Sequence, residues 1–259
     1  MRSILLFGFI VGSALNSIAV ADSVVWESGN LFSEDMRLPK EKPHPKDKVL
    51  FPSNAGGGGN HRISHGMLEW DGHQTRTYLD FYRIRPLINS EIEFYAMKNE
   101  DVEDVSAKIG NHSLKGWVFG GYGCVFEGTQ VKSKVEYYHN DQGTKFNVPL
   151  AQPIPAGQMI GYKVSKQNRS DGTVVMNCWV DYTGTGQNWV KVLENRVWAD
   201  ADWTPPSVPS GAHDSADIEK GVYVGPVQRW WIRINAINES KSANVKVKSI
   251  KISELSDLP

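Results

Sequence analysis

The stretch from Gly120 to Asp141 constrains the fold most strongly, because its side chains alternate over two runs that small residues separate. One side carries Tyr122, Cys124, Phe126, Val131, Val135 and Tyr137, and the other side of the second run carries Lys132, Lys134, Glu136 and Tyr138. A period of two is typical of a strand with one face on a core and one face toward water or a ligand. Gly128 and Thr129 lie between the runs and suit a chain reversal. The stretch therefore predicts an antiparallel hairpin with one polar face.

Short runs of the same kind continue along most of the chain. We expect strands over residues 24–26, 48–51, 63–70, 75–84, 91–97, 105–109, 146–150, 161–167, 173–182, 189–194, 222–225, 229–235 and 244–255. No window predicts an amphipathic helix, and no change of composition marks a second domain. So many strands, separated by turn residues, predict an all-β fold in which two antiparallel sheets pack as a β-sandwich or jelly roll. We expect a single domain over residues 22–259.

The N-terminus has the pattern of an export signal. Arg2 precedes the apolar run 4–11, and Ala19-Val20-Ala21 fits the small-x-small pattern before a cleavage point near Asp22. The run is too short for a spanning helix, and no later stretch approaches the roughly 20 apolar residues that a span needs. We therefore expect residues 1–21 to be a signal peptide, the protein to be secreted to an extracellular or periplasmic space, and no membrane span.

The charge balance limits the classes of partner. The 28 basic and 29 acidic residues give a net charge of -1, which creates no general field that attracts nucleic acid. We therefore expect no nucleic-acid partner, and any recognition of an anion must come from a local patch. The two cysteines and the absence of clustered histidines argue against a zinc site, so we expect no metal among the site residues.

Cys124 and Cys178 are the only cysteines, and the sequence leaves two interpretations open. In an oxidising compartment they could form one bridge between two core strands. The alternative is a pair of buried thiols, because free cysteine is among the most buried residue types.

Several segments together resemble the concanavalin A-like jelly-roll superfamily. These are SEIEFYAMKN, AKIGNHS, YGCVFEG with VKSKVEYYHND, and the closing strand VKVKSIKISEL. The segment Trp230-Trp231-Ile232-Arg233 before that closing strand is similar to the last hairpin of laminin-G-like and glycan-active members. The resemblance extends over residues 23–255 and rests on the style of the strands. It implies two curved antiparallel sheets, with carbohydrate bound across the concave one. Members include lectins, carbohydrate-binding modules, glucanases, and lyases of alginate and glucuronan.

The chain departs from the catalytic signatures of that superfamily. Glucanases carry an E-x-D-x-(x)-E strand, whereas Glu91-Ile92-Glu93 lacks the intervening aspartate and the third acid. Retaining hydrolysis needs carboxyl groups about 5–5.5 Å apart, while residues i and i+2 of a strand lie about 6.5–7 Å apart at Cα. The alginate-lyase signatures R-[ST]-E-[LV], Q-[IV]-H and Y-F-K-A-G are absent as well. A structural calcium ion is common in the superfamily, but no recognisable run of calcium ligands is present here, and we expect no other cofactor.

A first candidate set would suit β-elimination. Lys134, Tyr138 and His139 follow the polar side of the hairpin together with Lys132, and His112 precedes it. In β-elimination a neutral histidine or tyrosine removes the C5 proton, and a cation stabilises the enolate that forms. The alternative is a solvated face, on which alternating lysines are routine.

A second candidate set would suit the binding of an acidic sugar. Arg229, Trp231 and Arg233 share one side of their strand, and two arginines that flank an indole offer forked hydrogen bonds to a carboxylate. The alternative is a tryptophan packed under a neighbouring loop, with both arginines paired to Asp or Glu.

Two further polar sets complete the candidates. One set is Arg76, Tyr78, Asp80 and Tyr82, which would lie beside the second set if the two strands were neighbours; the other is Asn177, Trp179 and Asp181. Sequence alone does not assign any of these sets to a sheet.

Two functions follow from these patterns. The first is a secreted, monomeric carbohydrate-binding protein that engages a polysaccharide, of acidic character, in a groove on the concave sheet. The second is a polysaccharide lyase with a histidine or tyrosine base that cleaves a uronate-containing glycan. If the chain is an enzyme, its residues fit a lyase better than a glycoside hydrolase.

Overall fold

In the computed structural model, strands account for all the regular secondary structure among the described residues. The structure describes residues 23–27, 51–54, 59–72, 76–112, 118–138, 146–198, 218–219, 222–225, 227–237 and 243–258. The predicted signal peptide lies outside this part of the chain. No helix within it is long and apolar enough to cross a membrane.

The strands form two large antiparallel sheets. The eight-stranded sheet runs in the order β13 (Val190–Val197), β12 (Val174–Asp181), β11 (Met159–Asn168), β6 (Ser90–Lys98), β17 (Ala243–Glu254), β4 (Met67–Gly72) and β3 (Gly59–Ser64), and β1 (Ser23–Glu27) also pairs with β17. The seven-stranded sheet runs in the order β10 (Asn147–Pro149), β9 (Gln130–Tyr138), β8 (Val118–Glu127), β7 (Val102–His112), β16 (Val227–Ala236), β5 (Arg76–Leu87) and β2 (Phe51–Asn54). A two-stranded ribbon joins β14 (Ile218–Glu219) to β15 (Val222–Tyr223).

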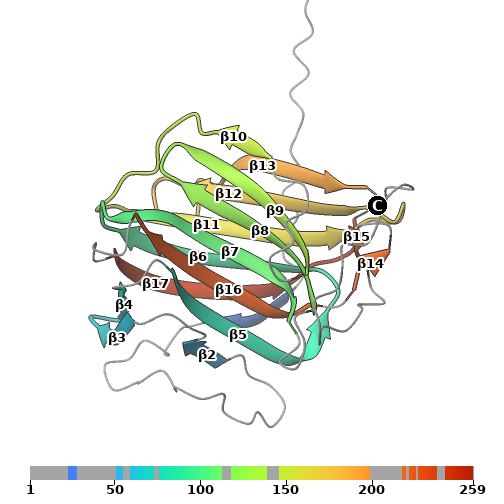
Figure 1. Cartoon of the computed structure of the whole chain (residues 1–259), viewed down its shortest axis with the longest axis horizontal. Coiled ribbons are helices and arrows are strands. Elements are labelled where there is room, and N and C mark those ends of the chain that lie inside the picture. The colour runs from blue at the N-terminus through green and yellow to red at the C-terminus, as the bar shows by residue number, and fades with distance from the viewer. Residues whose placement is uncertain are drawn as a thin grey trace, which may run out of the picture.

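The two large sheets pack face to face around the apolar core. In Figure 1 the layer with β9, β8, β7, β16 and β5 lies in front of the layer with β12, β11, β6 and β17. The rings of Phe126 in β8 and Tyr162 in β11 meet edge to face across the core, with their centroids 5.1 Å apart. The indole Nε1 of Trp230 in β16 donates to the Ser90 hydroxyl of β6 at 3.1 Å. The predicted all-β, two-sheet antiparallel sandwich of the jelly-roll type is therefore confirmed.

A disulfide bond also joins the sheets. Cys124 of β8 and Cys178 of β12 are bridged, and both side chains are fully buried in the core. Of the two interpretations that the sequence left open, the structure contains the bridge.

The local predictions hold for the hairpin and fail at one turn. β8 and β9 pair around Gly128 and Thr129 as the alternation predicts. The predicted single strand over 63–70 is instead the end of β3, a turn and most of β4. At the turn His65 and Gly66 both have positive φ, 52° and 69°, which the tightest hairpin turns require. A histidine in that conformation is not a strong turn signal, so the sequence pattern misses the reversal.

Candidate functional site

Four cross-strand rows occupy the outer face of the seven-stranded sheet, and we call them the polar face. In register they read Tyr82–Arg229–Gly110–Gly121–Glu136, Asp80–Trp231–Lys108–Gly123–Lys134, Tyr78–Arg233–Ser106–Val125–Lys132 and Arg76–Asn235–Asp104–Glu127. These positions alternate with Trp230, Ile232 and Ile234 of β16 and with their core neighbours on the other strands. Because successive side chains of a strand point to opposite faces, the rows lie on the side away from the core.

Most residues singled out from the sequence fall on this face. Its rows include the positions of Arg229, Trp231, Arg233, Lys134, Arg76, Tyr78 and Tyr82. The backbone positions of His112 and Tyr138 continue the same alternation at one end of β7 and β9. Because β5 and β16 are paired, the second and third candidate sets lie side by side, which the sequence had left conditional.

Two predicted residues do not join this group. Trp179 lies in β12 of the other sheet, opposite the core-facing Cys178. His139 lies outside the residues that the structure describes. The predicted catalytic set therefore has a described side chain only at Lys134.

A strip without side chains crosses the polar face. In one row Gly110 and Gly121 lie between Arg229 and the position of Glu136, and in the next row Gly123 lies between Lys108 and Lys134. The strip is closely covered at Gly123, where an added Cβ would lie 2.8 Å from Cγ of Lys108. The Lys108 stem therefore lies over the strip at Gly123.

The polar face is more basic than the chain as a whole. Among its described side chains five are basic, Lys108, Lys132, Lys134, Arg229 and Arg233, and two are acidic, Asp104 and Glu127, an excess of three positive charges. The whole chain carries a net charge of -1. Because a local excess of charge raises the local concentration of counter-ions, this face favours an anion more than the net charge of the chain suggests.

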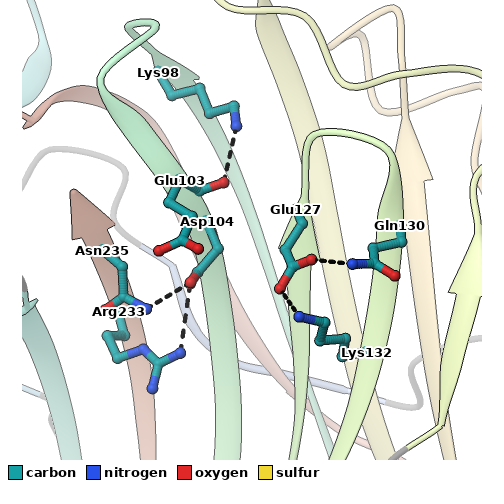
Figure 2. A network of polar contacts seen from close by, with 8 residues as sticks. All are labelled: Lys98, Glu103, Asp104, Glu127, Gln130, Lys132, Arg233 and Asn235. Carbon is teal, nitrogen blue, oxygen red and sulfur yellow. Dashed lines mark hydrogen bonds and ion pairs between the residues drawn. The ribbon is translucent and has the colours of Figure 1, made fainter. Parts of the chain in front are cut away.

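A polar network fixes one end of the face (Figure 2). Asp104 accepts hydrogen bonds from Nη2 of Arg233 at 3.5 Å and from Nδ2 of Asn235 at 2.5 Å. The side chains of Arg233 and Asp104 are only 8% and 5% exposed. Nε of Arg233 is buried and has no hydrogen-bond partner among the described residues. Asp104 therefore holds one part of the guanidinium and leaves another donor unused.

The other contacts in Figure 2 link neighbouring strands near the same end of the polar face. Glu127 accepts from Nε2 of Gln130 and pairs with Nζ of Lys132. Nζ of Lys98 donates to the backbone oxygens of Val102 at 3.2 Å and Glu103 at 3.5 Å. Burial lowers the pKa of the Lys98 ammonium, which nearby acids partly oppose. These contacts join β6, β7, β8 and β9 and keep the ends of the strands in register.

Burial separates the two interpretations of the Arg229–Trp231–Arg233 set. Arg229 is 4% exposed and Trp231 is 6% exposed, although both point away from the core. Arg233 pairs with Asp104, as the structural alternative expects. Trp231 therefore lies between two arginines as a packed side chain and does not present an open ring.

The outer face of the eight-stranded sheet holds the paired carboxylates. Glu91 and Glu93 share this face, and Nζ of Lys163 lies 3.7 Å and 3.1 Å from their carboxylate oxygens. Lys163 also lies 6.0 Å from the Trp179 ring centroid and 4.3 Å from that of Trp189. Burial raises the pKa of Glu91 to about 7, which Lys163 opposes and the Glu93 charge reinforces. Near neutral pH the Glu91 carboxyl therefore exists in both protonation states, unlike a typical surface glutamate.

No metal site is evident in the described part of the chain. Among those residues no three His, Cys, Asp or Glu side chains gather in a way that could hold an ion.

Comparisons with known proteins find solved structures that resemble this chain only in part. No protein-family model matches the chain, and no curated protein sequence matches it. A similar solved structure is the exoplasmic/lumenal domain of VIP36 bound to Ca²⁺ and Man3GlcNAc, at 10% identity and a TM-score of 0.48, with 78% of this chain and 84% of that chain covered. Crh5 transglycosylase in complex with NAG has 12% identity and a TM-score of 0.47, with 79% of each chain covered. Carbohydrate-binding module CBM66 from Bacillus subtilis has 11% identity and a TM-score of 0.45, with 78% of this chain and 95% of that chain covered.

The three structures share 10–12% identity with this chain at TM-scores of 0.45–0.48, so they carry no argument about its family, about what it binds or about what it does. The site must therefore be argued from its own residues.

Sequence reasoning missed part of the polar face. Asp104, Ser106 and Lys108 contribute to three of its four rows, and none was a candidate. Their signal was present, because they alternate with the core residues Val105, Ala107 and Ile109. This alternation predicts a strand. Its polar side becomes a candidate for the site only because β7 pairs with β16.

Proposed function

We propose that the chain is a secreted carbohydrate-binding protein that holds an acidic polysaccharide across the polar face. The observation that carries this proposal is the cross-strand register. It places Arg229 and Arg233 of β16, Lys108 of β7 and Lys134 of β9 on adjacent rows around the glycine strip. An extended polyanion lying along the strip would have Lys108 and Lys134 on its two sides at Gly123, and Arg229 on one side at Gly110.

The chemistry of the cations supports an acidic sugar. Guanidinium groups form forked, charge-assisted hydrogen bonds to carboxylates, and lysines add compact positive charge. Asp104 orients Arg233, and the Nε–H donor of that arginine has no partner among the described residues. Trp231 is packed between the two arginines, so we assign it the role of holding their stems in place.

The export pattern and the disulfide support secretion. The Cys124–Cys178 bridge joins the two sheets within the core. Structural disulfides form and persist in oxidising compartments such as the periplasm or the extracellular space. Together with the apolar run at the N-terminus, this favours a secreted protein.

A double substitution on the polar face tests the binding proposal. The Lys108→Gln/Lys134→Gln variant should elute earlier than the wild type from immobilised alginate or glucuronan, with an affinity about tenfold lower, because two charge contacts of about 0.5–1 kcal/mol each are lost. The difference should shrink at high salt, because salt screens the attraction between the glycan and the two lysines.

A control variant separates this local effect from net charge. Lys191→Gln/Lys248→Gln makes the same charge change on strands of the eight-stranded sheet and should leave retention unchanged. Equal losses in the two variants, or no retention of the wild type on any acidic glycan, would remove the polar face as the binding site.

A lyase is the second candidate. The backbone positions of His112 and Tyr138 lie on the two strands that flank β8, at the same end of the polar face. A base at either position would remove a proton from a uronate held over the strip. Ultraviolet absorbance of the unsaturated product, followed while the protein is incubated with alginate, glucuronan and pectate, detects this activity. Retention without a rise in absorbance would leave binding as the function and discard the lyase.

A further inference from the structure

A row of polar residues crosses the outer face of the eight-stranded sheet, on the opposite side of the molecule from the polar face. In register it reads Asn177 of β12, Ser165 of β11, Glu91 of β6 and Ser253 of β17. These positions alternate with core residues such as Val164, Cys178 and Ile252. The four side chains therefore point outward from adjacent strands.

Three members of the row carry buried polar atoms without partners. Asn177, Ser165 and Ser253 are 5%, 0% and 1% exposed. Among the described residues nothing hydrogen-bonds to Oδ1 of Asn177, Oγ of Ser165 or Oγ of Ser253. Folded proteins provide partners for nearly all such atoms, because a buried polar atom without a hydrogen bond lowers the stability of the fold. Three polar atoms without partners lie in one row, on either side of a carboxylate. This arrangement indicates a site for a ligand that forms hydrogen bonds.

The charges of this region do not favour an ionic ligand. Nζ of Lys163 lies 3.1 Å from the Glu93 carboxylate, and Nζ of Lys251 lies 3.6 Å from the same group. Two lysines therefore balance Glu91 and Glu93. A metal ion would meet the lysines and a polyanion would meet the glutamates, so neither is favoured over a neutral molecule.

The chemistry of the row fits a hydroxyl-rich molecule. The amide oxygen and the carboxylate accept hydrogen bonds, and the serine hydroxyls both donate and accept them. Aromatic side chains lie on the same face: Trp179 is the next outward residue after Asn177 on β12. The ring centroid of Trp189 lies 4.3 Å from Nζ of Lys163, which is 3.7 Å from the Glu91 carboxylate. Polar groups converging beside an aromatic wall are typical of small-ligand sites.

We propose that this row, centred on Glu91 between Ser165 and Ser253, is a second saccharide site that takes an uncharged sugar. The sugar hydroxyls supply the missing partners of Asn177, Ser165 and Ser253. Binding requires a covering side chain to move, and Lys251, whose side chain is 30% exposed, borders Ser253 and has room to do so. The site is independent of the polar face, and either one functions without the other.

The test uses the mature protein and three neutral probes, cellohexaose, laminarihexaose and mannohexaose. At least one should bind with a millimolar dissociation constant by isothermal titration or ligand-observed NMR. In the Ser165→Ala/Ser253→Ala variant its affinity should fall at least about tenfold, the loss expected when about 1.4 kcal/mol of contact is removed. The variant should remain folded with unchanged or higher thermal stability, because two buried unsatisfied hydroxyls are gone.

Controls separate this site from the proposed function. The Lys108→Gln/Lys134→Gln variant should bind the neutral probe as the wild type does, and the serine variant should keep its retention on acidic glycan. If no probe binds at millimolar concentration, or if the serine variant binds it equally well, the second site is refuted, whatever the outcome on the polar face.

Discussion

Loss of the Cys124–Cys178 bridge should lower the free energy of unfolding by about 4 kcal/mol. The bridge closes a loop with a sequence separation of 54 residues, and a cross-link of that span restricts the unfolded chain by roughly this amount. It also joins the two sheets in the middle of the core, so its loss removes a link between the layers. The Cys124→Ala/Cys178→Ala variant should therefore unfold at clearly lower urea concentration than the oxidised wild type.

The reduced wild type provides the matched control for this prediction. It keeps both side chains and lacks only the bond, so its midpoint should fall close to that of the double alanine variant. If the reduced and oxidised forms unfold at the same urea concentration, the bridge does not stabilise the fold. Mass spectrometry of the purified protein under non-reducing conditions should show no free thiol.

Replacement of Arg233 by methionine should lower the free energy of unfolding by about 3 kcal/mol. The side chains of Arg233 and Asp104 are almost fully buried, and removal of one partner leaves the other as an uncompensated buried charge. Asp104→Asn should destabilise the protein in the same way from the other side. The Arg233→Met/Asp104→Asn double variant should recover much of the loss, because no unpaired charge remains.

The same double variant separates stability from binding. It should unfold near the wild-type urea concentration yet bind acidic glycan at least about tenfold more weakly, since a forked contact to a carboxylate is gone. If the double variant is no more stable than either single variant, Arg233 and Asp104 are not coupled. If it binds acidic glycan as the wild type does, Arg233 has only a structural role.

The sequence predicted most of the local structure but missed the turn at His65 and Gly66. Its other limits arose where distant strands meet. The alternation within 120–141 predicted β8, β9 and their turn, because the period of two is a local property of a strand. Alternation shows that a strand has an apolar and a polar face, but it does not identify the sheet to which the strand belongs. Arg229 of β16 pairs with Tyr82 of β5 and with Gly110 of β7, more than a hundred residues earlier in the chain. No local signal encodes that register.

The sequence also could not predict how deeply the candidate site residues are buried. Trp231 has the position of a sugar platform, but its neighbours leave it 6% exposed. Trp179 has the same alternation as Trp231 and belongs to the opposite sheet. Whether a polar-side tryptophan is open or packed depends on side chains from other strands, and these are known only once the register is known.

The central claim is that an acidic glycan lies along the glycine strip of the polar face, and NMR of glycine amides tests it most directly. The mature protein is labelled with ¹⁵N-glycine and titrated with an oligoguluronate. The account predicts that the amide signals of Gly110, Gly121 and Gly123 shift as the ligand is added, while those of Gly157, Gly161, Gly172 and Gly184, which lie in β11 and in the loops and turns beside the eight-stranded sheet, stay in place. Shifts confined to the second group, or no shifts at a saturating concentration of ligand, would contradict it.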